Sequence, residues 1–396
     1  MKRDERYAKP SHKLWFFFIR RLSFLYTRLF LGFRCRDRYR IKKGEPVIVL
    51  SNHQTDEDPF CLFPVFDAPV YPVATDHIFS GKLRSRLFSY FSVIPKKKEA
   101  SDAKTVLKMF RLLKSGASIL LFPEGNRTYA EFCYPIAPGL PSFFKKTKAT
   151  LVLFNIRGGT GVSPRFKHKK RRGPFTGEIR RVLPYAEYAG MEDGALSRLI
   201  AETLTVFDSD SGARYKSRRR AEYLERMLFA CPRCGQTETL FSEGAFLTCR
   251  SCGLRAEYGE DLRLHGLEGY GRLVDWWNFQ KNAVRKMEIL PDGTVFSDEG
   301  VTLFFSTPFE KKKRLAVGKL TLTGAQLRCG GRVFETAKIA SVSAVSGRNL
   351  TFRYEENDYT LRGGKRFNPV KYLFLLNRLG EKTQKTETEK SVYPGD

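Results

Sequence analysis

Four cysteines constrain the fold of this chain more than any other feature. They form two Cys-x2-Cys pairs, Cys231 with Cys234 and Cys249 with Cys252, and 14 residues separate the pairs. Each pair turns two thiolates to one side of the chain, and two such turns supply the four ligands of a tetrahedral metal site. Because four protein ligands leave no open coordination position, the spacing predicts a structural metal and not a catalytic one.

Zinc is the metal that four thiolates favour, and the pattern is typical of a zinc ribbon, here residues 229–258. About 30 residues bury little core, so we expect the metal to supply most of the folding free energy of this module. The remaining cysteines show no pairing pattern; they are Cys35, Cys61, Cys133 and Cys329. Free thiols beside a thiolate metal site favour a reducing, cytoplasmic compartment.

A histidine and an aspartate follow the apolar run at residues 46–50. Residues 52–58 are Asn-His-Gln-Thr-Asp-Glu-Asp, which places His53 and Asp58 five positions apart. A histidine at the end of a buried strand can act as a general base when a carboxylate holds its other ring nitrogen. In a continuous helix such positions diverge by about 140°, so the pair can meet only across a strand-to-helix turn. The alternative is that Asp58, followed by proline, is an ordinary helix N-cap.

A second apolar run, at residues 117–122, leads into Pro-Glu-Gly and then Arg127. In open α/β sheets, polar residues just past the carboxyl ends of strands converge in one crevice, where ligands bind. The planar guanidinium of Arg127 is suited to a phosphate, and Gly125 allows the backbone to approach a ligand closely. Taken alone, this segment is equally compatible with a tight structural turn.

The two motifs together, Asn52-His53-x4-Asp58 and Phe122-Pro123-Glu124-Gly125-x-Arg127, resemble those of the HX4D glycerolipid acyltransferases, whose best-known members acylate lysophosphatidic acid. The resemblance covers about residues 14–190 and implies an α/β domain, 46–225, with a central mostly parallel sheet. In that family an arginine between the motifs contacts the acceptor phosphate, and this chain has lysines at residues 96–98 instead. The family's fourth motif corresponds at best to residues 151–156, which lack its prolines.

The resemblance implies acyl transfer without a serine or cysteine nucleophile and without a catalytic cofactor. His53 would take a proton from the acceptor hydroxyl, and Asp58 would stabilise the resulting imidazolium. The acceptor would be a lysophospholipid, most plausibly lysophosphatidic acid, and the donor acyl-coenzyme A or acyl-carrier-protein. The residues implied for acceptor binding are Glu124, Gly125, Arg127, Lys97 and Lys98.

Charge favours an anionic partner. The 396 residues have a formal net charge of +28, and residues 1–50 contain 14 basic and 4 acidic side chains. Either nucleic acid or an acidic membrane surface is compatible with this balance. Further basic clusters at 167–172 and 216–220 are either solvated faces or contacts for headgroup or coenzyme phosphates.

The N-terminal segment helps to choose between these partners. Residues 14–31 are rich in Phe and Leu but contain Arg20, Arg21 and Arg28. The apolar run is therefore too interrupted to span a bilayer, and no signal-peptide pattern follows it. We predict that residues 1–45 form an amphipathic membrane-interface segment, which would place the protein peripherally on the cytoplasmic face of the cell membrane. The alternative is a helix packed on the enzyme core.

The downstream half predicts further modules. Residues 268–287 have the pattern of a linker helix, and alternating apolar residues over 288–380 predict a β-rich domain that ends in a helix. That element order resembles pleckstrin-homology-like domains, and a polar, disordered tail is expected at 381–396.

Two rival functions are also compatible with the sequence, an inactive lipid-binding scaffold and a basic zinc-ribbon protein that binds nucleic acid. Residues 235–248 of the ribbon contain two glutamates and no lysine or arginine. A surface that binds phosphates is expected to contain basic residues, so this composition makes nucleic acid an unlikely partner.

Overall fold

A computed structural model of the protein describes residues 10–75, 93–96, 103–132, 135–307, 312–345 and 347–392. The chain divides into two compact units. The first unit contains the residues up to 164 together with 169–217 and 260–262. The second contains 165–168, 218–259 and the residues from 263 onward. The predicted ribbon, linker helix and β-rich domain therefore lie mainly in the second unit.

The first unit is built on a seven-stranded sheet with the strand order β1-β7-β6-β2-β5-β3-β4. In chain order the strands are β1 Phe33–Arg34, β2 Val47–Ser51, β3 Val70–Thr75, β4 Ile94–Lys96, β5 Ser118–Leu121, β6 Thr150–Arg157 and β7 Phe175–Leu183. Strand β7 runs antiparallel to β6, and the other pairings are parallel. The expected central, mostly parallel sheet is thus confirmed.

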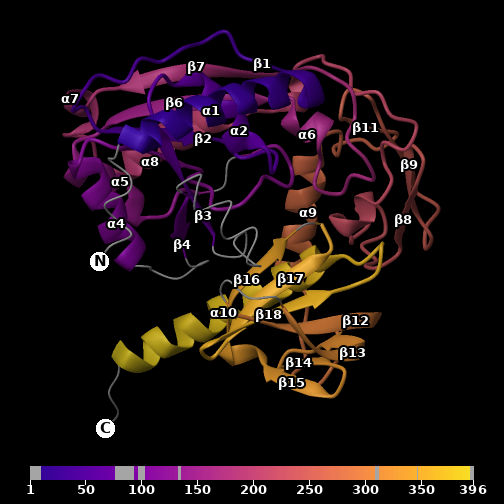
Figure 1. Ribbon diagram of the computed structural model, residues 1–396. Coiled ribbons are helices and arrows are strands. Elements are labelled where there is room, and N and C mark those ends of the chain that lie inside the picture. The colour runs from indigo at the N-terminus through magenta and orange to yellow at the C-terminus, as the bar shows by residue number, and fades with distance from the viewer. Residues whose placement is uncertain are drawn as a thin grey trace. The chain divides into compact units, whose positions relative to one another are not determined.

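Helices bury the sheet. Every residue of the central strand β2 is buried, as expected for a parallel strand that is covered on both faces. The residues of one face, including Ile48, Leu50 and Ile119, join a core cluster whose helical side chains come mainly from three helices. Those helices are α4 Ala103–Lys114, α5 Gly139–Thr147 and α8 Asp193–Leu204 (Figure 1). Short helices complete the unit; they are α2 Asp58–Leu62, η3 Phe63–Val65, α6 Gly159–Val162, α7 Tyr185–Tyr188 and η5 Asp208–Asp210.

The N-terminal helix α1 Pro10–Tyr26 continues into the π-helical turn η2 Thr27–Leu31. A narrow stripe is buried, with Phe16 in edge contact with Phe63 at 6.0 Å between ring centroids. The exposed surface of α1 and η2 includes Arg21 and Arg28 and a large set of apolar side chains. The exposed apolar residues are Leu14, Trp15, Phe17, Phe18, Leu22, Phe24, Leu25, Leu29 and Phe30. None of the described helices is long and apolar enough to cross a membrane.

The cysteine module folds as a four-stranded sheet with the order β11-β10-β9-β8 and antiparallel pairing throughout. Its strands are β8 Leu240–Glu243, β9 Phe246–Cys249, β10 Arg255–Tyr258 and β11 Leu264–His265. Each Cys-x2-Cys turn is followed by a glycine with positive φ, Gly235 at 72° and Gly253 at 70°. Their backbone N–H groups donate to the carbonyls of Cys231 and Cys249, which closes each turn so that its two thiols point together.

The β-rich part of the second unit is an antiparallel seven-stranded sheet with the order β15-β14-β13-β12-β18-β17-β16. Its strands are β12 Phe296–Ser306, β13 Lys313–Leu322, β14 Gln326–Cys329, β15 Arg332–Glu335, β16 Ile339–Val345, β17 Asn349–Tyr354 and β18 Asn357–Arg362. The linker helix α9 spans Leu273–Lys286, and the C-terminal helix α10 spans Pro369–Val392. Residues 381–392 were predicted to belong to a disordered tail, but they continue helix α10. They contain neither proline nor glycine, the residues that would end the helix.

Buried polar contacts join the ribbon to the β-rich sheet. Lys371 of α10 is buried, lies 2.7 Å from the carboxylate of Asp298 in β12, and also pairs with Glu238 of the ribbon. Trp276 of α9 donates its indole N–H to the carbonyl of Ala230 at 2.8 Å. The modules of the second unit therefore share one interior.

Candidate active site

A histidine–carboxylate pair lies just past the end of β2. His53 Nδ1 is 2.8 Å from Asp58 Oδ2, and Asp58 is fully buried whereas His53 is 20% exposed. The chain leaves β2, turns, and enters α2 at Asp58, which is the strand-to-helix junction that brings positions i and i+5 together. Because a buried carboxylate accepts from Nδ1–H, the other ring nitrogen, Nε2, is left as the proton acceptor.

Asp58 is held by more than the histidine. Its Oδ2 accepts hydrogen bonds from the backbone N–H groups of Gln54 at 2.7 Å and Thr55 at 2.9 Å. Its Oδ1 accepts from the Thr55 hydroxyl at 2.5 Å. Several donors on one buried carboxylate fix its orientation toward the imidazole.

The second motif holds the loop that contains His53. The Glu124 carboxylate accepts from the backbone N–H of His53 at 2.9 Å, and the backbone N–H of Thr128 donates to the His53 carbonyl at 2.8 Å. The ring of Phe122 stacks on the imidazole with centroids 4.2 Å apart. The two motifs thus meet in space, as expected for residues at the carboxyl ends of the adjacent strands β2 and β5.

Arg127 is 9% exposed and makes contacts with all three of its nitrogens. Nε donates to the Gln54 carbonyl at 3.0 Å, Nη2 donates to the Ser163 carbonyl at 2.8 Å, and Nη1 lies 3.0 Å from the Asp56 carboxylate. In this geometry the guanidinium connects the His53 loop to the residue that follows α6. The sequence-based assignment of Arg127 to an acceptor phosphate stays a prediction.

The other predicted acceptor residues have different placements. Gly125 is exposed, has φ of +67°, and would have open space around an added Cβ. The Glu124 carboxylate is directed at the backbone N–H of His53. Lys97 and Lys98 lie outside the described residues, while Lys96 is exposed at the end of β4.

Sequence reasoning missed the residues that clamp this loop. Asn52 bridges to β6, because its side chain donates to the Ile156 carbonyl at 2.8 Å and accepts from the Ile156 N–H at 2.7 Å. Gln54 accepts from the N–H of Gly159 at 2.8 Å. Thr55, three residues before Asp58, fits the capping-box spacing, and that local signal could have identified it.

Two buried carboxylates lie behind the loop, beside α6. Asp208 accepts from the N–H of Gly158 at 2.7 Å and also from the Thr160 hydroxyl, and Glu131 accepts from the Ser209 hydroxyl at 2.6 Å. Burial, together with the neighbouring Asp208 charge, raises the pKa of Glu131 to about 7. Burial also raises the pKa of Asp208. The pair therefore favours a protonated state near neutral pH.

The four predicted metal ligands come together in the second unit. Their sulfur atoms all lie within 4.8 Å of one another, with Cys231 and Cys252 at 3.6 Å and Cys234 and Cys249 at 3.8 Å. A tetrahedral ion with Zn–S bonds of about 2.3 Å requires S···S separations of roughly 3.8 Å. The arrangement is thus able to hold a metal ion, and its geometry fits zinc.

The His53–Asp58 pair lies at the carboxyl edge of an α/β sheet, and a histidine held by a carboxylate in this way has the chemistry of a general base. Residues 32–157 match the family model described as Acyltransferase. Residues 32–157 therefore form an acyltransferase domain, as the resemblance predicted.

A solved structure is similar to part of this chain. None of the curated proteins compared with the chain matches it. Among solved structures, the 1-acyl-sn-glycerophosphate (LPA) acyltransferase PlsC from Thermotoga maritima is similar, with a TM-score of 0.42 and 18% sequence identity. The match covers 51% of this chain and 81% of that chain.

Proposed function

We propose that the protein transfers a fatty acyl chain from an acyl thioester to the free hydroxyl of a lysophospholipid, and that lysophosphatidic acid is the acceptor. The observation that supports this most directly is the 2.8 Å contact between His53 and Asp58 within the acyltransferase domain. The thioester would come from acyl-coenzyme A or acyl-carrier-protein.

The proposed reaction uses Nε2 of His53 as the base. As the acceptor hydroxyl attacks the thioester carbonyl, its proton passes to Nε2 and a tetrahedral intermediate forms. Asp58 stabilises the imidazolium through Nδ1–H without taking a proton itself. Collapse of the intermediate breaks the C–S bond, the imidazolium returns the proton to the departing thiolate, and ester and thiol are released.

Acceptor recognition is proposed from the polar groups that surround this pair. Glu124, Gly125 and Arg127 follow β5, and Lys97 and Lys98 follow β4 in the sequence. The lysines would supply positive charge for a phosphate headgroup without the fork geometry of an arginine. Glu124 would act mainly through the His53 backbone, which it contacts.

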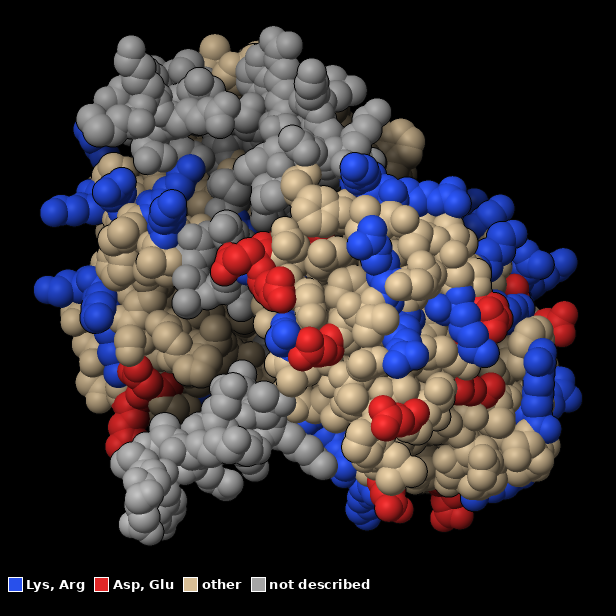
Figure 2. Space-filling view, turned by 90° about the horizontal axis from the view of Figure 1, so that it is seen from below, with Lys and Arg blue, Asp and Glu red and all other residues tan. Residues whose placement is uncertain are grey.

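Membrane attachment is proposed for the apolar surface of α1 and η2. Leu29 is 71% exposed and Phe30 is 75% exposed, and Arg20, Arg21 and Arg28 lie on the same segment. Aromatic and aliphatic side chains enter the acyl boundary of a bilayer while arginines reach the headgroups. Lys and Arg side chains are spread over the face shown in Figure 2, and in the whole sequence 70 Lys and Arg outnumber 42 Asp and Glu. This balance favours an anionic surface such as the cytoplasmic leaflet.

The downstream modules are proposed to be a zinc ribbon and a pleckstrin-homology-like domain. The ribbon assignment rests on the sulfur separations and the two glycine-closed turns. The second assignment is supported by the antiparallel strand order with β12 next to both β13 and β18, followed by α10. Zinc would be structural and would take no part in acyl transfer.

The test is an acylation assay on the full-length protein. Wild type, His53→Ala and Asp58→Asn would be incubated with anionic liposomes, lysophosphatidic acid and a panel of acyl donors, and the product followed by mass spectrometry. We expect wild type to form phosphatidic acid, and both variants to lose on the order of 10²–10⁴-fold in turnover while keeping the wild-type melting curve. Equal turnover by His53→Ala would remove the base assignment, and product with other lysolipids alone would replace the acceptor.

Membrane attachment needs its own measurement. Leu29→Ser with Phe30→Ser would be compared with Val317→Ser with Val333→Ser, which removes two exposed apolar side chains from the second unit. Burial of one such side chain contributes about 1.5–3 kcal/mol, so the first pair should weaken liposome co-sedimentation by at least tenfold. Comparable loss in both pairs would argue against attachment through this segment.

A further inference from the structure

A strip of alternating rings and guanidinium groups lies on the surface of the second unit. Arg250 and Arg366 both lie over the ring of Phe241, with Cζ 4.4 Å and 4.0 Å from its centroid. Arg366 also lies 5.4 Å from the ring of Tyr223, and Arg226 lies 3.9 Å from that same ring. One continuous stack therefore runs from Arg250 to Arg226.

The strip continues beyond Tyr223. The imidazole of His168 stacks on the Tyr223 ring with centroids 5.8 Å apart and planes 27° from parallel. His168 Nε2 in turn lies 3.5 Å from Nη1 of Arg219. We call this surface the cation–aromatic strip; it consists of His168, Tyr223, Arg226, Phe241, Arg250 and Arg366. Its members come from five separate stretches of the chain.

Hydrogen bonds and ion pairs to the rest of the second unit hold the arginines of the strip in place. Arg366 donates to the Ser242 carbonyl at 3.0 Å and pairs with the buried carboxylates of Glu225 and Glu222. Arg226 donates its Nε–H to the Lys365 carbonyl at 2.6 Å. These contacts hold the guanidinium planes against the rings, so a flat ligand would find them already in place.

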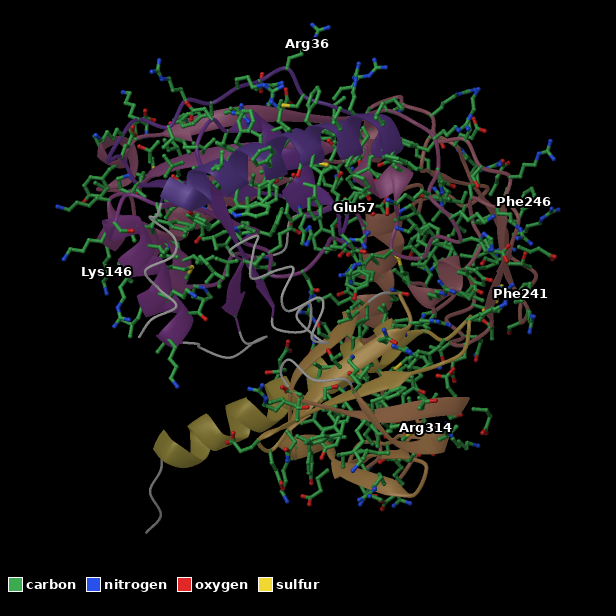
Figure 3. All side chains as sticks on the ribbon, in the orientation of Figure 1. Arg36, Glu57, Lys146, Phe241, Phe246 and Arg314 are labelled. Carbon is green, nitrogen blue, oxygen red and sulfur yellow. The ribbon has the colours of Figure 1, made fainter. Side chains whose placement is uncertain are left out.

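The neighbouring ribbon sheet extends the same chemistry. Phe241 in β8 and Phe246 in β9 are half-buried on the same face of the sheet, and both are labelled in Figure 3 at the outer side of these strands. Arg255 of β10 lies 3.8 Å above the ring of Phe246. The exposed Glu243 is the acidic residue of β8 on this face, and Glu257 of β10 pairs with Arg220.

We infer that this face of the second unit binds single-stranded nucleic acid, a function that goes beyond acyl transfer. Aromatic rings and arginine planes stack on nucleobases, and the exposed guanidinium edges pair with phosphates. A bilayer is the less suitable partner, because insertion needs protruding apolar side chains of the kind found on α1. The rings of Phe241 and Tyr223 are instead half-buried, and two guanidinium groups lie over each of them.

The composition of the ribbon alone argues against this partner, since residues 235–248 contain no lysine or arginine. The structure supplies the charge from elsewhere. Arg250 and Arg255 lie just beyond that span, and Arg226 and Arg366 reach the surface from before the ribbon and from after β18. The electrostatic feature expected of a nucleic-acid surface is therefore present although the segment itself lacks it.

The experiment is a fluorescence anisotropy titration of full-length protein into labelled single-stranded RNA and DNA of about 16 nucleotides. Arg226→Gln with Arg250→Gln removes two cations of the strip. Arg314→Gln with Arg332→Gln removes two exposed arginines of the β-rich sheet and serves as the control for net charge. Figure 3 labels Arg314 in the β-rich part. Phe241→Leu removes a stacking ring without changing charge.

We expect wild type to bind, the strip double variant to bind at least tenfold more weakly, and the control to change less than twofold. The slope of log affinity against log salt should fall by about 1.4 in the strip variant, for two lost phosphate contacts. Phe241→Leu should weaken binding about tenfold. Melting curves and bound-metal analysis would confirm that each variant is folded.

Three results would overturn the inference. They are no binding by wild type at low salt, equal losses in the strip and control variants, and binding to anionic vesicles that the strip substitutions weaken while oligonucleotides do not bind. Because the readout is binding and not turnover, failure here is distinguishable from failure of the proposed acyl transfer.

Discussion

The carboxylate of Glu124 accepts a 2.9 Å hydrogen bond from the backbone N–H of His53, 71 residues away along the chain. This bond joins the second motif to the first at the residue proposed to act as base. Glu124 is therefore placed to control the position of the imidazole through the main chain.

Removing that acceptor should lower turnover. For Glu124→Ala we expect kcat to fall about tenfold, because a loop hydrogen bond contributes about 1–1.5 kcal/mol and the imidazole is displaced without it. Glu124→Gln retains an oxygen acceptor and should lose less than threefold. The measurement is steady-state kinetics in the acceptor concentration, and equal losses for the two variants would contradict this role.

Substitution of Arg127 separates positioning from binding. Each of its three nitrogens already has a protein partner, and two of these partners, Gln54 and Asp56, belong to the His53 loop. We expect Arg127→Ala to lower kcat by more than tenfold and to raise the acceptor KM by less than threefold. If KM rises strongly while kcat holds, Arg127 is instead a ligand of the acceptor phosphate. Arg157→Ala, at a half-exposed ion pair with Glu178, is the control.

Stability should depend on pH through Glu131. Its pKa of about 7 in the folded protein lies above its ordinary value of 4.5, so the folded state binds the proton more tightly. The free energy of unfolding should therefore fall as pH rises from about 4.5 to about 7, by up to about 3 kcal/mol.

Glu131→Gln tests this dependence. The amide keeps an oxygen acceptor for Ser209 but has no proton to lose, so chemical denaturation between pH 4.5 and 8 should show a flatter profile. Glu178→Gln, at a half-exposed carboxylate of β7, is the matched control. A profile for Glu131→Gln that matches wild type would contradict the assignment.

Metal content should follow the four clustered cysteines. We expect about one zinc per chain by elemental analysis, and Cys234→Ser should abolish it and lower the melting temperature of the second unit, because metal binding and folding are coupled in such modules. Cys35→Ser changes a cysteine outside the cluster and should keep the metal. Zinc retained at full occupancy in Cys234→Ser would contradict the site.

Lys371 should stabilise the second unit. Its buried ammonium group faces the carboxylates of Asp298 and Glu238, so Lys371→Met leaves two acids without their cation and should cost about 3–5 kcal/mol. Lys338→Met, at the exposed pair with Glu335, should change little. The measurement is urea denaturation of both variants. Similar unfolding midpoints for Lys371→Met and Lys338→Met would contradict the stabilising role of Lys371.

The pairing of His53 with Asp58 was predictable because its determinants are local. A buried strand, a turn and a helix-starting proline all lie within about a dozen residues, and the spacing then brings the two side chains together. The antiparallel strands of the second unit were predictable for the same reason, since alternation of apolar residues is a property of each segment.

The contacts of Arg127 and Asn52 were not predictable. They depend on the strand order of the sheet. That order brings Ile156 beside Asn52, 104 residues earlier in the chain, and Ser163 beside Arg127. No spacing in the sequence encodes that proximity. The cation–aromatic strip escaped prediction likewise, because its arginines and rings are separated along the chain and meet through tertiary packing.

The path of the chain between the two units limits how this protein can be divided. Residues 165–168 belong to the second unit and 260–262 to the first, although their neighbours on both sides belong to the other unit. Tyr215 donates its backbone N–H to the carbonyl of Glu260, so the short return segment is bound into the first unit. No single cut of the chain after residue 164 therefore separates the two units completely, because each fragment either loses residues of its own unit or keeps residues of the other. In proteins whose modules are joined by one linker, each module can be expressed alone. Here we expect the two units to fold, to be expressed and to be degraded together.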